Sequence, residues 1–261
     1  MIHTFKLDTK IVLITGGYGH LGKAVTESLL FHGAQVYILG RDRDKFSQSF
    51  QQELKNSTNL FFEFCDISST EEIKKAYSKI YDKTGRIDVL INNAFYSKGQ
   101  SPERMTDEEW EIGIDGTLNS VFRCTREIIP YFKTAKNGKI INVSSMYGVV
   151  APHFEVYDDF PQFLNPPHYG VAKAGVIQLT KYYASYLGHL GINVNTVTPG
   201  PFPSLQVQKE AGFVEELEKK TCLNRIGKPE DLAGAFIFLA SDASNFITGQ
   251  NIIVDGGWTI K

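Results

Sequence analysis

The sequence predicts an α/β fold in which one parallel sheet of about seven strands carries helices on both faces. Short apolar runs alternate with helical stretches along all 261 residues, as expected when crossover helices connect parallel strands. A glycine-rich turn joins the first apolar run to the first helical stretch. No linker rich in proline, serine or glycine divides the chain. We therefore expect a single doubly wound, Rossmann-type domain over residues 1–261.

Seven apolar runs are the expected strands. The first run, residues 10–15, leads into a glycine turn, and helical periodicity begins at residue 23. The remaining runs are separated by stretches long enough to hold the helices of parallel crossovers. They lie at residues 35–39, 60–65, 87–91, 139–144, 192–197 and 251–254.

The glycine turn after the first strand predicts a dinucleotide site. Gly17, Gly19 and Gly22 satisfy the pattern G-x-G-x-x-G, in which missing side chains allow a tight turn and close approach of a pyrophosphate. The N-terminus of the following helix adds unpaired N–H groups and a partial positive charge. The expected coenzyme contacts in this turn are Gly16, Gly17, Gly19, His20, Leu21 and Gly22.

The end of the second strand favours NADP over NAD. Gly40 stands where an acidic residue would bind the 2′-hydroxyl of NAD. Arg41 comes next, and a guanidinium group suits the 2′-phosphate of NADP. The alternative is a solvated turn in which Arg41 and Arg43 pair with Asp42 and Asp44, and it leaves NAD as the second coenzyme to consider.

Tyr169 and Lys173 are the candidate catalytic pair. They lie four residues apart and so share one face of a helix. A positive charge beside a phenol lowers its pKa from about 10 toward neutrality, which would make Tyr169 a usable proton carrier. Ser145 closes the apolar run upstream. A chance pair on a solvated helix face is the alternative, and the glycine turn favours the catalytic interpretation.

Taken together, these motifs resemble the compact branch of the short-chain dehydrogenase/reductase family over nearly the whole chain. The resemblance implies hydride transfer between a nicotinamide coenzyme and a carbonyl or secondary alcohol. In this scheme Tyr169 carries the proton, Ser145 hydrogen-bonds the reacting oxygen, and Lys173 lowers the phenol pKa and holds the nicotinamide ribose. The resemblance also implies coenzyme contacts at Tyr169, Lys173, Asp66, Ile67, Asn93, Ala94, Pro199 and Gly200.

Three substitutions depart from the family pattern. His20 and Phe95 each stand where glycine is usual, and Phe95 narrows the freedom of the backbone at its position. Thr117 occupies the position of the usual catalytic asparagine, and Asn119, two residues on, should face elsewhere on the helix. A threonine hydroxyl or carbonyl can also hold a water molecule, so Thr117 is a further candidate catalytic residue.

Two segments are expected near the substrate. Ser145 and Tyr169 are 24 residues apart, longer than usual for the family, which indicates an inserted loop at residues 146–168. This insert is either a surface loop or a lid whose rings pack a substrate while acidic side chains bind hydroxyl or amino groups. Residues 201–226 are the expected substrate lid, although their charged stretch 215–220 also suits an ordinary solvated helix.

The substrate is expected to be a sugar or sugar derivative. Residues 144–152, the insert and residues 250–258 resemble oxidoreductases of bacterial flagellin modification and surface-polysaccharide biosynthesis. Phenylalanines at 154, 160, 163 and 202 would also suit an apolar ligand. Two other functions stay open: an NADP-binding sensor or scaffold without turnover, and a sugar epimerase or dehydratase that uses its coenzyme transiently.

Composition argues against several other classes. The net charge of −2 and the lack of a basic stripe give no support for nucleic-acid or anionic-membrane binding. No apolar run approaches the roughly 20 residues of a membrane span, and residues 1–6 lack a signal-peptide core. Three scattered cysteines suggest a cytoplasmic protein. The histidines do not have the spacing of metal ligands, so we expect no metal site. The family resemblance implies a homodimer or homotetramer, in which the apolar run 232–240 either packs between subunits or forms a core helix.

Overall fold

The computed structural model describes residues 5–261 and contains the expected parallel sheet. Its strand order is β3-β2-β1-β4-β5-β6-β7, and all neighbouring strands run parallel. Each strand lies within two residues of an expected apolar run at either end. The bounds are β1 (Ile11–Thr15), β2 (Gln35–Gly40), β3 (Leu60–Phe64), β4 (Val89–Asn92), β5 (Gly138–Val143), β6 (Ile192–Pro199) and β7 (Asn251–Val254).

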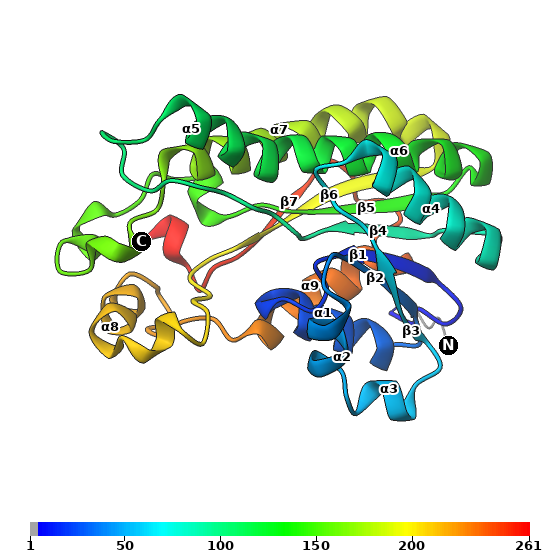
Figure 1. Ribbon diagram of the computed structural model, residues 1–261, viewed down its shortest axis with the longest axis horizontal. Coiled ribbons are helices and arrows are strands. Elements are labelled where there is room, and N and C mark those ends of the chain that lie inside the picture. Colours follow the sequence, from blue (N-terminus) through cyan, green and yellow to red (C-terminus); the bar gives the residue numbers. More distant parts are fainter. Residues whose placement is uncertain (1–4) are drawn as a thin grey trace.

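Helices cover both faces of this sheet (Figure 1). One face carries α4 (Thr70–Thr84), α5 (Asp107–Ile114), α6 (Ser120–Ala135) and α7 (Pro167–Leu187). The other face carries α1 (His20–Phe31), α2 (Arg43–Ser49), α3 (Glu53–Asn56) and α9 (Pro229–Ala240). Helix α8 (Ala211–Lys219) lies beyond the sheet, at the end of the molecule that also holds the C-terminus.

Two apolar cores, one on each face, follow from the alternation of side chains along the strands. In β1, Val12 and Ile14 join the core beneath α1 and α9, whereas Ile11 and Leu13 join the opposite core. The apolar run 232–240 lies within α9, where Leu232, Phe236, Ile237, Leu239 and Ala240 are buried in the first core and Phe238 is partly buried against it. The interpretation of this run as a core helix is therefore confirmed.

The inserted loop packs against α8 through a third apolar cluster. It forms three short 3₁₀ turns, Met146–Gly148, Phe154–Tyr157 and Pro161–Phe163. The Phe213 ring on α8 lies 5.8, 5.5 and 4.6 Å, between centroids, from the rings of Tyr157, Phe160 and Phe163. The rings of Phe160 and Phe163 therefore pack on protein, and contact of the insert with a substrate stays a prediction.

Polar contacts fix the same insert at its edges. Lys220 Nζ lies 2.6 Å from Glu155 Oε1, so one acid expected to bind substrate instead pairs with the segment after α8. Gln100 Nε2 donates to the carbonyl oxygens of Gln162 and Leu164 at 2.7 and 2.9 Å. The insert is thus tied both to α8 and to the loop that follows β4.

Over residues 5–261, none of the helices combines the length and the apolar character that crossing a membrane requires. Within the same residues, no three His, Cys, Asp or Glu side chains gather as metal ligands do. Residues 1–4, which belong to the segment examined for a signal peptide, lie outside the described part of the chain.

Candidate functional site

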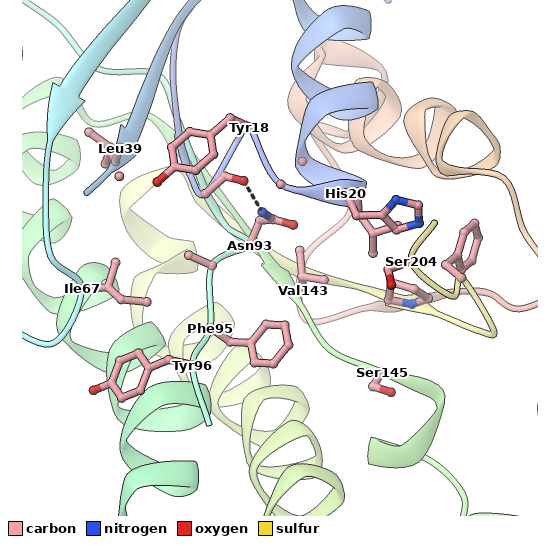
Figure 2. A pocket seen from close by; sticks show the side chains of 18 of the residues that line it. Tyr18, His20, Leu39, Ile67, Asn93, Phe95, Tyr96, Val143, Ser145 and Ser204 are labelled. Carbon is pink, nitrogen blue, oxygen red and sulfur yellow. Dashed lines mark hydrogen bonds between the residues drawn. The ribbon is translucent and has the colours of Figure 1, made fainter. Parts of the chain in front are cut away.

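A cavity of about 660 Å³ lies at the carboxyl ends of the strands. Strand β1 has β2 on one side and β4 on the other, so the winding direction reverses there and leaves a crevice above the sheet. Figure 2 shows residues from both halves of the chain around this space. The predicted residues that line it are Gly16, Gly19, His20, Leu21, Gly22, Arg41, Ile67, Asn93, Ala94, Ser145, Tyr169, Lys173, Pro199 and Gly200.

The glycine turn forms the floor of the cavity and fits a pyrophosphate. Gly19 caps α1 without any side-chain hydrogen bond, and no acidic residue stands in the first helical turn. The first N–H groups of α1 are therefore available to an anion. A Cβ on Gly22 would approach the Gly16 carbonyl oxygen to 2.5 Å, whereas one on Gly17 would meet the side chains of Ile14, Thr26 and Ile38. Gly17 thus serves packing, and it does not line the cavity.

His20, the unusual residue of this turn, is the first residue of α1 and faces the cavity next to Ser204 (Figure 2). Burial lowers the pKa of its imidazole, opposed by a hydrogen bond to the Pro203 backbone. Its Nε2 atom is buried and has no hydrogen-bond partner within residues 5–261. His20 therefore lies between the phosphate-binding turn and the start of the expected substrate lid.

At the far end of the cavity, the turn after β2 has other contacts than the expected alternative, in which Arg41 would pair with a neighbouring aspartate of the same turn. Arg41 Nη1 lies 3.7 Å from Asp66 Oδ2, and Asp42 caps α2 by accepting from Lys45 N at 2.8 Å. Hydrogen bonds from Ser68 and the Arg41 charge outweigh burial and lower the pKa of Asp66. Asp66 does not line the cavity itself and instead orients Arg41 at its rim.

Asn93 holds two strand ends together beneath the cavity. Its Nδ2 donates to the carbonyl oxygens of Thr15 and Gly16 at 3.0 and 3.2 Å. The Thr15 hydroxyl in turn accepts from the backbone N–H groups of Asn93 and Ala94, both at 3.0 Å. Asn93 and Ala94 line the cavity as predicted, while the Asn93 amide itself serves to fix the glycine turn.

Strand β5 and helix α7 bring the three candidate catalytic residues together. Ser144 Oγ donates to the Lys173 carbonyl oxygen at 2.8 Å, and Lys173 Nζ donates to the Val143 carbonyl oxygen at 2.7 Å. The Ser145 hydroxyl accepts from Tyr147 N at 3.2 Å. The end of β5 therefore fixes the register of α7, which carries both Tyr169 and Lys173.

The pKa values of this pair differ from the expectation. Burial raises the pKa of the Tyr169 phenol to about 12, and hydrogen bonding to Ser145 only partly opposes the rise. Burial also lowers the pKa of Lys173 to about 7. The Lys173 amine lies 5.5 Å from the centroid of the Tyr169 ring and donates to Val143. The net shift of the phenol pKa is thus upward, because desolvation is its largest cause, and the effect of Lys173 on this pKa stays a prediction.

Thr117 lies apart from the cavity. It is buried in the π-helical turn Asp115–Asn119, and its hydroxyl has no hydrogen-bond partner among the described residues. It does not line the cavity. Asn119 faces elsewhere, as expected, and donates to Asp115 Oδ1 at 3.1 Å.

Sequence reasoning missed several cavity residues. Tyr18 projects from within the glycine turn, and Lys45 lies on the first turn of α2. Proximity to the predicted motifs was the available signal for both. Phe202 and Ser204 belong to the start of the expected substrate lid at 201–226, and both line the cavity. No residue of the insert at 146–168 lines the cavity.

Relatives of known type share this chain's whole length. A family model described as Enoyl-(Acyl carrier protein) reductase matches residues 19–259. The 3-oxoacyl-[acyl-carrier-protein] reductase FabG of Thermotoga maritima is 35% identical over 263 residues, which cover 98% of this chain and 100% of that protein. The 7alpha-hydroxysteroid dehydrogenase of Bacteroides fragilis is 33% identical over 270 residues, which cover 98% of this chain and 96% of that protein.

Solved structures with bound coenzyme have the same fold. A short chain dehydrogenase from Leptospira borgpetersenii with bound NAD+ superposes with a TM-score of 0.86 at 33% identity, covering 98% of this chain and 94% of that one. A gluconate 5-dehydrogenase from Burkholderia cenocepacia in complex with NADP and tartrate gives 0.88 at 27% identity, covering 99% and 98%. The uncapped α1 terminus and the cavity above β1 fit such a coenzyme. This chain therefore belongs to the short-chain dehydrogenase/reductase family, and the protein is an NAD(P)-dependent oxidoreductase.

Proposed function

We propose that the protein transfers hydride between NADP and a carbonyl or secondary alcohol of a sugar or sugar derivative, with Ser145, Tyr169 and Lys173 as its catalytic residues. One observation carries the proposal: these three side chains line the same cavity as the uncapped, glycine-rich start of α1. A coenzyme with its pyrophosphate at that turn would reach toward the end of β5, where Ser145 lies.

In the direction of carbonyl reduction, each of the three catalytic side chains has a separate role. Bound nicotinamide coenzyme supplies the hydride to the carbonyl carbon. Tyr169 donates its phenolic proton to the oxygen, which suits a phenol that burial keeps protonated at neutral pH. Ser145 donates a hydrogen bond to the same oxygen as negative charge develops there. In its protonated form, Lys173 stabilises the tyrosinate formed by proton transfer. Because burial lowers its pKa to about 7, Lys173 exchanges its proton near neutral pH.

The preference for NADP is supported by sterics and charge. A Cβ on Gly40 would lie 2.5 Å from Tyr18 Cε1. The tyrosine ring therefore occupies the space that an acidic side chain at position 40 would need to bind the 2′-hydroxyl of NAD. Two cationic side chains, Arg41 and Lys45, line this end of the cavity. Phosphate recognition by such a pair is charge-assisted, and Asp66 is the acid that competes for Arg41.

A sugar substrate is supported by the similarity of residues 144–168 and 250–258 to oxidoreductases of bacterial glycan biosynthesis. The gluconate 5-dehydrogenase structure, with its hydroxylated tartrate ligand, supports the same class of substrate.

We extend the proposal to a cytoplasmic protein because its three cysteines are free. We also propose a homodimer or homotetramer, since α6 and α7 leave Phe122, Tyr182 and Tyr186 exposed, and sedimentation would measure it.

A second candidate is the reduction of 3-oxoacyl thioesters, favoured by the FabG relatives. The two candidates are separated by following oxidation of NADPH with a panel of keto-sugars, sugar nucleotides and 3-oxoacyl thioesters. We expect turnover with a member of the sugar group and at most a small rate with thioesters. Turnover confined to thioesters would overturn the proposal, and sugar conversion without net coenzyme oxidation would indicate an epimerase or dehydratase.

A further inference from the structure

Phe95 is one of the departures from the family pattern that the proposed mechanism does not use. It follows Asn92-Asn93-Ala94 at the carboxyl end of β4, where glycine is usual. Half of its surface is exposed, although the residues before it are largely buried. An aromatic side chain left open to solvent at a reacting centre has apolar area available for a ligand.

The ring stands at the junction of the coenzyme and substrate regions. Its centroid lies 5.6 Å from that of the Tyr169 ring, with 56° between their planes. Lys173 Nζ lies 5.4 Å from the same centroid. In Figure 2 the ring leaves the end of β4 and points toward the side of the cavity that holds Ser145. A ligand carbonyl at Ser145 and Tyr169 would therefore have its neighbouring carbon atoms beside Phe95.

Phe95 presents an apolar ring beside the candidate catalytic side chains, and Phe202 is the other phenylalanine that lines the cavity. Ser145, Tyr169 and Lys173 present polar groups, and the side chains of Phe160 and Phe163 are packed on Phe213. A pyranose ring in its chair form has polarised C–H bonds on its faces and hydroxyl groups at its rim. The negative face of an aromatic ring attracts such C–H bonds, whereas an open-chain polyol offers no comparable flat face.

We propose that Phe95 is a specificity-determining residue whose ring forms the apolar wall of the reacting centre and receives the C–H face of a ring-form sugar. This inference rests on the proposed sugar-directed function and refines it from sugars in general to pyranoses. The glycine usual at this position would leave the wall open, and leucine would keep its volume without an aromatic face.

The test compares two probes on the protein–NADP complex. Dissociation constants for methyl β-D-glucopyranoside and D-gluconate are measured by ligand-observed NMR for the wild type, F95A and F95L. We expect F95A to weaken the pyranoside about tenfold, the upper range of an aromatic contact, with gluconate changed less than about twofold. F95L should recover only part of the loss. Phe154 is similarly exposed but lies outside the cavity, so F154A should change neither constant.

Four results would overturn the inference: wild-type protein that binds no pyranoside, pyranoside binding that is unchanged in F95A, an equal loss for both probes in F95A, or a loss of NADPH affinity in F95A, which would place the ring against the coenzyme. The readout is binding, so it is separate from turnover. Pyranoside binding that depends on Phe95, together with turnover confined to thioesters, would overturn the proposed function alone. Pyranoside binding that ignores Phe95 would overturn this inference alone.

Discussion

At the scale of single residues, burial controls the chemistry of Tyr169. Because its pKa is raised, the phenol is protonated at neutral pH and suits the role of proton donor in carbonyl reduction, whereas a base would have to be ionised. Replacing Tyr169 by phenylalanine should lower kcat/KM for the substrate found in the panel by about 10²–10⁴, the usual contribution of a general acid, while NADPH affinity is retained. Tyr147 is a matched control because its hydroxyl bonds Tyr157 at 2.6 Å outside the cavity. Comparable losses in Y169F and Y147F would contradict the assignment.

Lys173 should make stability depend on pH in a defined window. Its pKa is about 7 when folded and close to 10.5 when unfolded, so between these values the unfolded chain binds more protons. The contribution of Lys173 to stability therefore rises with pH through this window. The difference in unfolding free energy between wild type and K173M should grow by about 2 kcal/mol from pH 7 to pH 9, measured by urea denaturation.

Lys139 provides the control for this measurement. It is also buried, donates to Ser244 Oγ at 3.0 Å and lies outside the cavity, and burial lowers its pKa to about 8. The wild type minus K139M difference should rise in the same direction but begin about one pH unit higher. A wild type minus K173M difference that stays flat or falls from pH 7 to pH 9 would show that Lys173 keeps an ordinary pKa.

Arg41 should decide the choice of coenzyme. It is exposed at the cavity rim and only loosely held by Asp66 at 3.7 Å, so it is free to contact a 2′-phosphate. Replacing Arg41 by alanine should weaken NADPH binding about tenfold or more, as expected for a charge-assisted hydrogen bond, and change NADH binding little. Fluorescence titration of both coenzymes measures this. Wild-type protein that binds NADH as tightly as NADPH would contradict the argument.

At the scale of elements, a buried polar chain attaches α7 to the sheet. Asn142 on β5 accepts from Asn92 Nδ2 at 2.8 Å and donates to the Thr180 hydroxyl on α7 at 2.8 Å. Asn142→Leu would leave both partners short of a hydrogen bond and should cost about 2–4 kcal/mol of unfolding free energy. Thr196→Val removes only the 2.7 Å bond to Thr180 and should cost about 1 kcal/mol. Equal costs in denaturant titrations would refute this ordering.

The contact between α8 and the insert depends on Phe213. Its removal takes away the ring on which three aromatic side chains of the insert converge. In F213A, hydrogen exchange should become faster across residues 153–164 and 211–219, with the strands of the sheet unchanged. Phe246 is fully exposed, so F246A is the control and should leave exchange unaltered. Exchange that stays slow in F213A would show that the insert is held by other contacts.

At the scale of the whole molecule, the sequence predicts the sheet and much less of what surrounds it. The alternation of apolar runs with helical stretches locates all seven strands, because each strand is a short apolar run such as 139–144. The contact of Phe160 with Phe213 joins segments about fifty residues apart in sequence, and no local pattern encodes such a pairing. The raised pKa of Tyr169 likewise depends on burial by distant elements, which the Tyr-Lys spacing alone does not encode.

The same distinction applies to the candidate site. Residues in motifs, such as Gly19 and Ser145, lie around the cavity because strand ends of a parallel sheet converge there. Tyr18 and Lys45 also line it, and the Tyr18 ring fills the space beside Gly40, a packing that no local pattern encodes. Thr117 was selected by alignment with the family pattern, and its burial outside the cavity follows from the π-helical turn that contains it.

The protein is proposed to transfer hydride from NADPH to a sugar carbonyl in a single cavity, with Tyr169 as the proton donor. The most direct measurement is transfer of deuterium from C4-deuterated NADPH to the keto-sugar found in the panel, read by mass spectrometry of the product. We expect a product that carries one deuterium at the reduced carbon with wild-type protein and almost none with Y169F. Tight NADPH binding without deuterium in any product, as a sensor or scaffold would show, would contradict it.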